Sequence, residues 1–377
     1  MIASVNKSEW PKIFLLDELW LKTRRVVVHK LEENNLWLCN NDYIQFYNSF
    51  KESGEKIKQE VLLTVLGEHD YSIINSESAF RLSNQQLRTK IPFALSFGYS
   101  IGEFFLEIFN KSLNKESTKE ICSLCALFNL GISIFDLLND QLPLEFDELS
   151  KIFPLAILRS MNKGRKMFPI HDQLYEIEKT EIRILLKIIN HFYDQLYQLI
   201  PGEENIGIDR KLQNYLERAY KAELLSKANG HIQSLKHLKK ISKEKSVLPF
   251  WIMGLIVTKQ HVNTFDRSEE LNQLSILLGN IFHLIDDLSD LISDFNLSDI
   301  NTIWLEIINE DYRKDSSLDY SAVDKIISNY TIERYTNKLS EHILVTFSKI
   351  ENLLNGDEEK ILMLKKTILF YVRKWLS

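Results

Sequence analysis

Long runs of apolar residues at helical spacing constrain this sequence more than any other feature. Residues 175–200, YEIEKTEIRILLKIINHFYDQLYQLI, repeat apolar side chains three and four positions apart, and alternating runs typical of β-strands are hard to find. The 377 residues include only 12 Gly and 7 Pro, so tight turns must be scarce. The sequence therefore predicts an all-α protein.

Breaks between the helices are expected where turn-forming residues cluster. None of these breaks is long enough, or rich enough in Pro and Ser, to serve as an interdomain linker. We therefore predict one domain over residues 1–377, built as a large helical bundle. The breaks fall near residues 34–42, 140–147, 201–209, 261–270 and 355–359.

Charge and composition exclude several classes of function. The net charge is −6 with no long basic block, so nucleic acid is not an expected partner. The N-terminus, MIASVNKSEWPKIF, has neither a basic region nor an apolar core typical of a secretory signal, which makes the cytoplasm the expected location. The longest nearly apolar stretch, ICSLCALFNLGISIF, has 15 residues, short of the ~20 that span a bilayer, so no transmembrane segment is expected.

The three cysteines predict neither a disulfide framework nor a zinc site. Cys122 and Cys125 form a lone CxxC without a second pair, and Cys39 stands apart. We expect Cys122 and Cys125 to be core packing.

Two expected helices share an unusual construction. The first spans about 118–141 and begins with a capping-box pattern of Ser117 and Glu120, and the second runs from about 268 to 294. Both are apolar on nearly every face for most of their length, which predicts that they are buried among other helices. Both become acidic towards the C-terminal end.

In the second helix, residues 281–294 read IFHLIDDLSDLISD. Asp286, Asp290 and Asp294 recur every four residues and form one row, with Asp287 beside it. Each like-charge pair costs about 0.2–0.5 kcal/mol on an isolated helix, and the negative end of the helix dipole adds to the cost. A solvated acidic face is one interpretation, and a bound cation is the other. His283 lies on the same side and is expected to pack or to support a ligand.

The first helix repeats the pattern with Asp136 and Asp140. Two buried helices that both end in carboxylates favour two acidic walls facing each other across a cavity. Oxygen ligands select a hard cation, and Mg²⁺ prefers one or two carboxylates with waters and phosphate oxygens. The pattern therefore predicts a diphosphate bound to the protein through Mg²⁺.

These motifs resemble those of the trans-isoprenyl diphosphate synthase and class I terpene synthase superfamily, over roughly residues 85–300. LLGNIFHLIDDLSD is similar to the second aspartate-rich motif, in which Asp286, Asp287 and Asp290 stand as DDxxD and Asp294 extends the row. Upstream, NGHIQSLKHLKKISKEKSVLPFWIMG is similar to a GQ helix followed by a Lys-Thr step, with Lys245 in the lysine position. The resemblance implies an all-α bundle of the isoprenoid synthase type around a central active-site cavity.

The first motif departs from the synthase pattern. DLLND keeps Asp136 and Asp140 but has Leu137 in place of the second aspartate, and the arginine pair that follows this motif in synthases is missing. LRTKIPF, residues 87–93, is only loosely similar to the basic segment that holds the second diphosphate. These departures weaken chain elongation and leave ionisation chemistry in place.

The resemblance implies how the site would work. Mg²⁺ ions, three in number and replaceable by Mn²⁺, would bind an allylic prenyl diphosphate, and Lys245, with Arg88 or Lys90 next in order, would bind the diphosphate directly. Aromatic side chains would line a dry pocket for the cation, with Phe135 beside the first motif. In relatives the residues before this motif form a floor that limits prenyl length. Here the floor positions are Gly131 and Ile132, and the small floor implies a long chain, C15 to C25. The residues expected in metal binding are Asp136, Asp140, Asp286, Asp287, Asp290 and Asp294, and those expected in catalysis are Asp136, Asp140, Asp286, Asp290 and Lys245.

Three hypotheses follow. The first is a class I terpene synthase that cyclises or rearranges the cation from one prenyl diphosphate. The second is a prenyltransferase that joins the allylic group to isopentenyl diphosphate or to another acceptor. The third is a non-catalytic subunit of a heteromeric prenyl diphosphate synthase. Relatives also suggest a homodimer.

Overall fold

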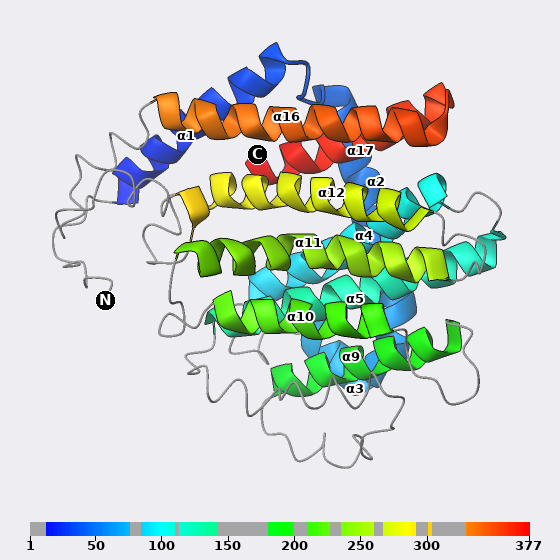
Figure 1. The fold of residues 1–377 in the computed structure, drawn as a ribbon. Helices are drawn as coiled ribbons and strands as arrows, with labels where there is room; N and C mark the ends of the chain where they lie inside the picture. The colour runs from blue at the N-terminus through cyan, green and yellow to red at the C-terminus, as the bar shows by residue number, and fades with distance from the viewer. Residues whose placement is uncertain are drawn as a thin grey trace. The chain divides into compact units, whose positions relative to one another are not determined.

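The computed structural model describes residues 13–75, 84–109, 113–141, 180–199, 210–226, 235–259, 267–291, 301–303 and 329–377. Nearly all of these residues are helical and none of them forms a strand, so the all-α prediction is confirmed for this part of the chain (Figure 1). The helices are α1 (Ile13–Glu33), α2 (Asn40–Ile57), α3 (Leu63–Asn75), α4 (Asn84–Phe109), α5 (Lys115–Gln141), α9 (Thr180–Leu199), α10 (Arg210–Ser226), α11 (Leu235–Lys259), α12 (Ser268–Ser289), α16 (Asn329–Leu354) and α17 (Glu358–Leu376), with a π-helical turn η2 (Lys58–Leu62) between α2 and α3.

The observed helix ends agree with several predicted breaks. α1 ends and α2 begins around the break at 34–42, α5 ends at the start of the break at 140–147, and the break at 355–359 separates α16 from α17. The break at 201–209 and most of that at 261–270 lie outside the described residues.

Packing groups the chain into two compact units. Unit 1 comprises Met1–Ile44, Ile232–Lys243 and Leu277–Ser377, and unit 2 comprises Gln45–His231 and Glu244–Ile276. The single domain over residues 1–377 stays a prediction.

α5 is the central helix of unit 2, where it packs against α4, α9 and α10. Between residues 121 and 138 only Ser123, Ser133 and Asp136 are half-buried, and every other side chain is buried. The prediction of a helix apolar on nearly all faces and surrounded by others is therefore confirmed. Asp136 is the one charged side chain in this stretch.

Two glycines of α4 let α4 and α5 approach closely. A Cβ atom at Gly98 would lie 2.5 Å from the Cys125 carbonyl oxygen, and one at Gly102 would lie 3.2 Å from the Cα of Cys122. Both cysteines are buried free thiols, as expected for core packing. The two cysteines therefore fill the space between α4 and α5 beside these glycines.

The contacts between α4 and α5 also show the register in which the two helices pack. One turn before Gly98 on α4, the Ala94 carbonyl accepts a hydrogen bond from the Asn129 amide Nδ2 at 2.8 Å. One turn before Ala94, Lys90 Nζ lies 4.0 Å from Asp136 Oδ2. Positions on α4 fall by four as those on α5 rise, so the helices are antiparallel. This register brings Lys90 to the acidic end of α5.

The start of α5 corrects one prediction. The helix begins at Lys115, and the Asn114 side chain accepts a hydrogen bond from the Ser117 backbone N–H at 2.9 Å. Asn114 is therefore the cap, and the predicted capping box of Ser117 and Glu120 is wrong. Asparagine caps helices as well as serine does, and here it precedes serine by three residues.

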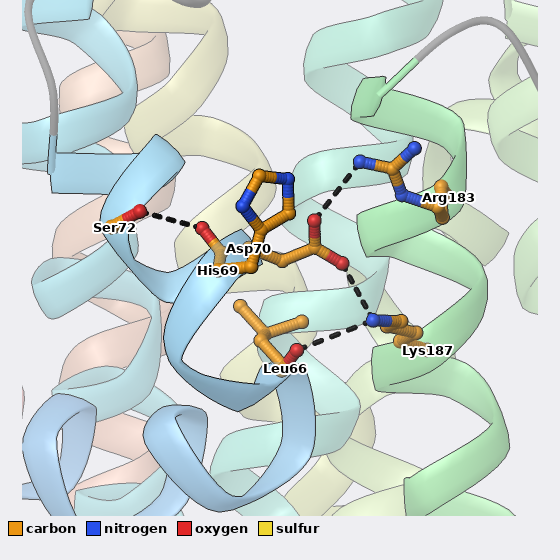
Figure 2. A network of polar contacts seen from close by, with 6 residues as sticks. All are labelled: Leu66, His69, Asp70, Ser72, Arg183 and Lys187. Carbon is orange, nitrogen blue, oxygen red and sulfur yellow. Dashed lines mark hydrogen bonds and ion pairs between the residues drawn. The ribbon is translucent and has the colours of Figure 1, made fainter. Parts of the chain in front are cut away.

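A buried ion-pair network joins α3 to α9 in unit 2 (Figure 2). Asp70, whose side chain is 3% exposed, receives Arg183 at 2.9 Å on one oxygen and Lys187 at 2.6 Å on the other. Lys187 also donates to the Leu66 carbonyl at 3.2 Å. That carbonyl precedes Gly67, whose φ of 74° interrupts the helical conformation, so the lysine satisfies an oxygen that the kink has exposed.

In unit 1, α16 packs against both α1 and α17. The turn between α16 and α17 uses Asn355 and Gly356 with positive φ, and the Asp357 side chain caps α17 by accepting from the Lys360 backbone N–H. Arg24 on α1 donates to the carbonyl of Leu376 at 2.7 Å.

Two helical segments, Lys90–Phe109 and Lys115–Leu138, are long and apolar enough to cross a membrane by length and composition. The structure buries 72% and 83% of their most apolar windows against other parts of the protein. Burial of this kind is what the central helices of a folded core show.

Candidate functional site

Lys245 on α11 and Asp136 on α5 come together at the acidic end of α5. Lys245 Nζ donates to Asp136 Oδ1 at 2.9 Å. The two residues are 109 positions apart in the sequence, and both lie in unit 2. A cation is favoured here because a half-buried carboxylate such as Asp136 needs an opposite charge.

Glu223 on α10, which no sequence motif predicts, completes this cluster. Its Oε2 atom lies 3.0 Å from Lys245 Nζ, and its side chain is only 4% exposed. The stretch YKAELLS around Glu223 places this acid among apolar positions of an amphipathic helix. An acid on an apolar helix face was the available signal, since buried carboxylates need a partner.

The pKa values of Asp136 and Glu223 are shifted in opposite directions. Burial alone would raise the pKa of Asp136, but the charges of Lys245 and Lys90 outweigh it and hold that pKa below its ordinary value. Burial raises the pKa of Glu223 well above its ordinary value, against the opposing charge of Lys245, and the charge of Asp136 adds to the rise. The surroundings therefore favour the ionised form of Asp136 and the protonated form of Glu223.

Of the two basic residues expected from α4, Lys90 reaches the cluster and the Arg88 side chain lies outside the described residues. Lys90 is 44% exposed, compared with 28% for Lys245 and 26% for Asp136. Lys90 therefore forms the outer edge of the cluster.

The floor positions Gly131 and Ile132 lie one turn before Asp136 and are buried. A Cβ atom at Gly131 would lie 3.1 Å from the hydroxyl oxygen of Tyr220 on α10. The Tyr220 ring in turn meets Phe135 edge to face, with centroids 5.4 Å apart. Tyr220 thus fills the space beside Gly131, and the inference of a long prenyl chain stays a prediction.

The acidic end of α12 belongs to unit 1. Asp286 and Asp290 are exposed, and the Asp290 backbone N–H still bonds the Asp286 carbonyl at 2.9 Å although α12 ends at Ser289. The two carboxylates therefore keep the predicted one-turn spacing, and Asp294 lies outside the described residues. Two carboxylates with waters suit Mg²⁺.

Asp287 differs from its neighbours because it is buried. Its Oδ2 atom accepts a hydrogen bond from Thr302 and lies 3.6 Å from His283 Nε2. Its carbonyl accepts from Asn301 Nδ2 at 2.7 Å. These contacts fasten residues 301–303 to α12, and His283 supports Asp287 as a packing partner.

The metal predictions fit the two helix ends differently. Asp136 has an ammonium group near each oxygen, and two unit charges 4 Å apart interact by about 4 kcal/mol near a protein surface, so a divalent ion there would meet strong repulsion. Asp286 and Asp290 fit a metal better, since both are exposed acids. Within the described residues no three His, Cys, Asp or Glu side chains are grouped to hold an ion, and the Asp140 side chain is not among them.

Asp136 and Asp290 belong to different units. Their convergence on one cavity, and the whole set of metal ligands, stay predictions.

Comparisons with known proteins give distant similarities. No family model and no curated protein matches this chain. Geranylgeranyl pyrophosphate synthetase from Pyrococcus horikoshii Ot3 is similar in structure, with 12% sequence identity and a TM-score of 0.43 over 86% of this chain and 99% of that one. T. brucei FPPS is similar with 14% identity and a TM-score of 0.40 over 87% of this chain and 98% of that one. At these values the likeness settles neither the family nor the activity of this chain.

Proposed function

We propose that this chain is a class I terpene synthase, which ionises an allylic prenyl diphosphate with Mg²⁺ and cyclises or rearranges the resulting cation. The contact between Lys245 and Asp136 carries the proposal. Two sequence motifs that lie far apart along the chain predicted that Lys245 binds the diphosphate and that Asp136 belongs to the same site. In the structure Lys245 Nζ lies 2.9 Å from Asp136 Oδ1.

The lysines would bind the leaving group. When the carbon–oxygen bond of an allylic diphosphate breaks, both electrons go to the diphosphate oxygen and an allylic cation remains. Fixed cations that face the developing negative charge lower the barrier, because they need no reorganisation during the reaction. Lys245 and Lys90 lie on the two sides of Asp136 and are suited to this task.

Asp286 and Asp290 would hold Mg²⁺ with its waters. Bound Mg²⁺ would supply Lewis-acid stabilisation of the diphosphate charge. The carboxylates would fix the ion at the end of α12.

The allylic cation needs surroundings that exclude water. Beside Asp136, Phe135 and Tyr220 are buried and pack ring to ring. Aromatic faces stabilise a desolvated cation by about 2 kcal/mol. We assign these two rings to the apolar side of the site.

A prenyltransferase is the second candidate, in which Lys90 would hold a second diphosphate instead of the leaving group. Two diphosphates need more positive charge than one, and Lys90 adds a second ammonium group 4.0 Å from Asp136. Under this alternative the allylic cation would alkylate isopentenyl diphosphate or another acceptor.

Incubation of the purified protein with Mg²⁺ and C10 to C25 allylic diphosphates tests the proposal, with and without isopentenyl diphosphate. Diphosphate release together with a hydrocarbon or alcohol from one substrate alone, seen by gas chromatography, supports the terpene synthase. A product that forms only with isopentenyl diphosphate supports the prenyltransferase. Absence of diphosphate release in every mixture contradicts both, and stimulation of a partner synthase would then support the non-catalytic subunit.

We also propose a homodimer in the cytoplasm. Sedimentation equilibrium tests the dimer, and a mass near the 44.3 kDa of one chain would contradict it.

A further inference from the structure

Four ionisable side chains of unit 2, each from a different helix, form one cluster. Lys90 comes from α4, Asp136 from α5, Glu223 from α10 and Lys245 from α11. Lys245 Nζ lies 2.9 Å from Asp136 Oδ1, and Lys90 Nζ lies 4.0 Å from Asp136 Oδ2. Each oxygen of Asp136 therefore already faces an ammonium group.

Lys245 contacts two carboxyl groups. Glu223 Oε2 lies 3.0 Å from Lys245 Nζ, and Asp136 Oδ1 lies 2.9 Å from it. A lysine has a long flexible side chain, and two carboxyl groups on different helices remove much of that freedom. The ammonium group is thus fixed in place before any ligand arrives.

The four side chains differ in exposure, so the cluster is buried at Glu223 and open to solvent at Lys90. Glu223 is 4% exposed, Asp136 and Lys245 are about equally half-buried, and Lys90 is the most exposed. An anion from solution would reach Lys90 first and Glu223 last.

We propose that the cluster at the acidic end of α5 is a lysine clamp, in which Asp136 and Glu223 hold Lys245, with Lys90, to bind a diphosphate group directly and without a metal ion on Asp136. The inference rests on the proposed function for the identity of the anion. Asp136 then acts as a positioning residue for the lysines, and metal binding is left to the acids of α12.

Calorimetric titration with inorganic pyrophosphate in EDTA tests the clamp. The wild type should bind pyrophosphate without metal, more tightly than inorganic phosphate, and Lys245→Met should weaken this binding at least tenfold. Lys119→Met is the matched control, because Lys119 lies at the other end of α5 and pairs with exposed Glu60. Pyrophosphate binding that requires Mg²⁺ in the wild type, or that survives in Lys245→Met, overturns the proposal.

Two further variants separate positioning from general stability. Glu223→Ala should weaken metal-free pyrophosphate binding at least fivefold, whereas Glu223→Gln, whose amide oxygen can still accept from Lys245, should stay within threefold of the wild type. Equal affinities in all three proteins would contradict the role of Glu223. Circular dichroism spectra confirm that each variant is folded.

Asp136→Asn distinguishes a positioning residue from a metal ligand. Under the clamp, adding Mg²⁺ should raise pyrophosphate affinity by the same factor in Asp136→Asn and in the wild type. Loss of this Mg²⁺ effect in Asp136→Asn would assign Asp136 to the metal and overturn the inference. Metal-free binding without turnover of any allylic diphosphate would keep the clamp and refute the proposed function, whereas Mg²⁺-dependent turnover without metal-free binding would do the reverse.

Discussion

Asp70→Asn should destabilise unit 2 by about 3 kcal/mol. Asp70 is 3% exposed and meets Arg183 and Lys187 at 2.9 and 2.6 Å (Figure 2). Removing one partner of a buried ion pair costs about 3–5 kcal/mol, because the remaining charges lose their compensation. Arg183 and Lys187 are 15% and 16% exposed and can turn partly towards water, which places the cost at the lower end of that range.

Urea unfolding followed by circular dichroism at 222 nm measures this cost. Glu60→Gln is the control, because Glu60 and Lys119 form an ion pair of similar length, 2.7 Å, that is exposed. An exposed pair contributes about 0–1 kcal/mol. The two variants should therefore differ by about 2 kcal/mol or more.

The destabilisation caused by Asp70→Asn should also depend on pH. Burial would raise the pKa of Asp70, but Lys187 and Arg183 outweigh it and hold that pKa below its ordinary value. A carboxyl group with a lowered folded pKa contributes stability above its unfolded pKa of about 3.9 and loses that contribution as the pH falls through the folded pKa. The difference between wild type and Asp70→Asn should be constant near neutral pH and shrink below about pH 4.

A destabilisation by Asp70→Asn no larger than that of Glu60→Gln would refute the reasoning. The double variant with Lys187→Met offers a second check. If uncompensated charge causes the loss, removing Lys187 as well should cost less than the sum of the two single changes.

Three other predictions concern the core and the site. Asp290→Asn should lower turnover of an allylic diphosphate by roughly a thousandfold or more while the circular dichroism spectrum is unchanged, because it removes one of two carboxylates expected to hold Mg²⁺; wild-type turnover would contradict the assignment. Gly98→Ala should destabilise the protein by about 1–3 kcal/mol in urea, because its Cβ would lie 2.5 Å from the Cys125 carbonyl oxygen; an unchanged midpoint would show that α4 and α5 can separate at no cost. In the native protein a thiol reagent should label exposed Cys39 rapidly and Cys122 and Cys125 only on unfolding, since both are buried and burial raises the pKa of each thiol; rapid labelling of three thiols would contradict this.

The helical pattern of the sequence was sufficient for the fold class and for much of the helix placement. α9 (Thr180–Leu199) falls inside the predicted run at 175–200, and α12 begins at Ser268 as expected. Local signals were less reliable at helix ends, where Asn114 replaced Ser117 as the cap of α5. Several residues near a helix end can serve as caps, and sequence alone does not rank them.

The candidate site could be predicted only in part. Lys245 and Asp136 were expected to act together through the motif resemblance, and the structure brings them into contact. Glu223 was not expected, because it belongs to no recognised motif. It joins the cluster only because α10 packs beside α5 in the folded protein. Asp287 was expected among the metal ligands, yet it is buried, and its contact with Thr302 depends on a segment 15 residues further along.

The sequence by itself determined which segments are helical and which helices must be buried, since both depend on the spacing of apolar residues within one helix. Only the tertiary structure decided which charges meet. Gly98 and Gly102 allow α4 and α5 to approach, and the resulting register places Lys90 beside Asp136. Such a register follows from the packing of side chains between two helices, a property that neither helix carries in its own sequence.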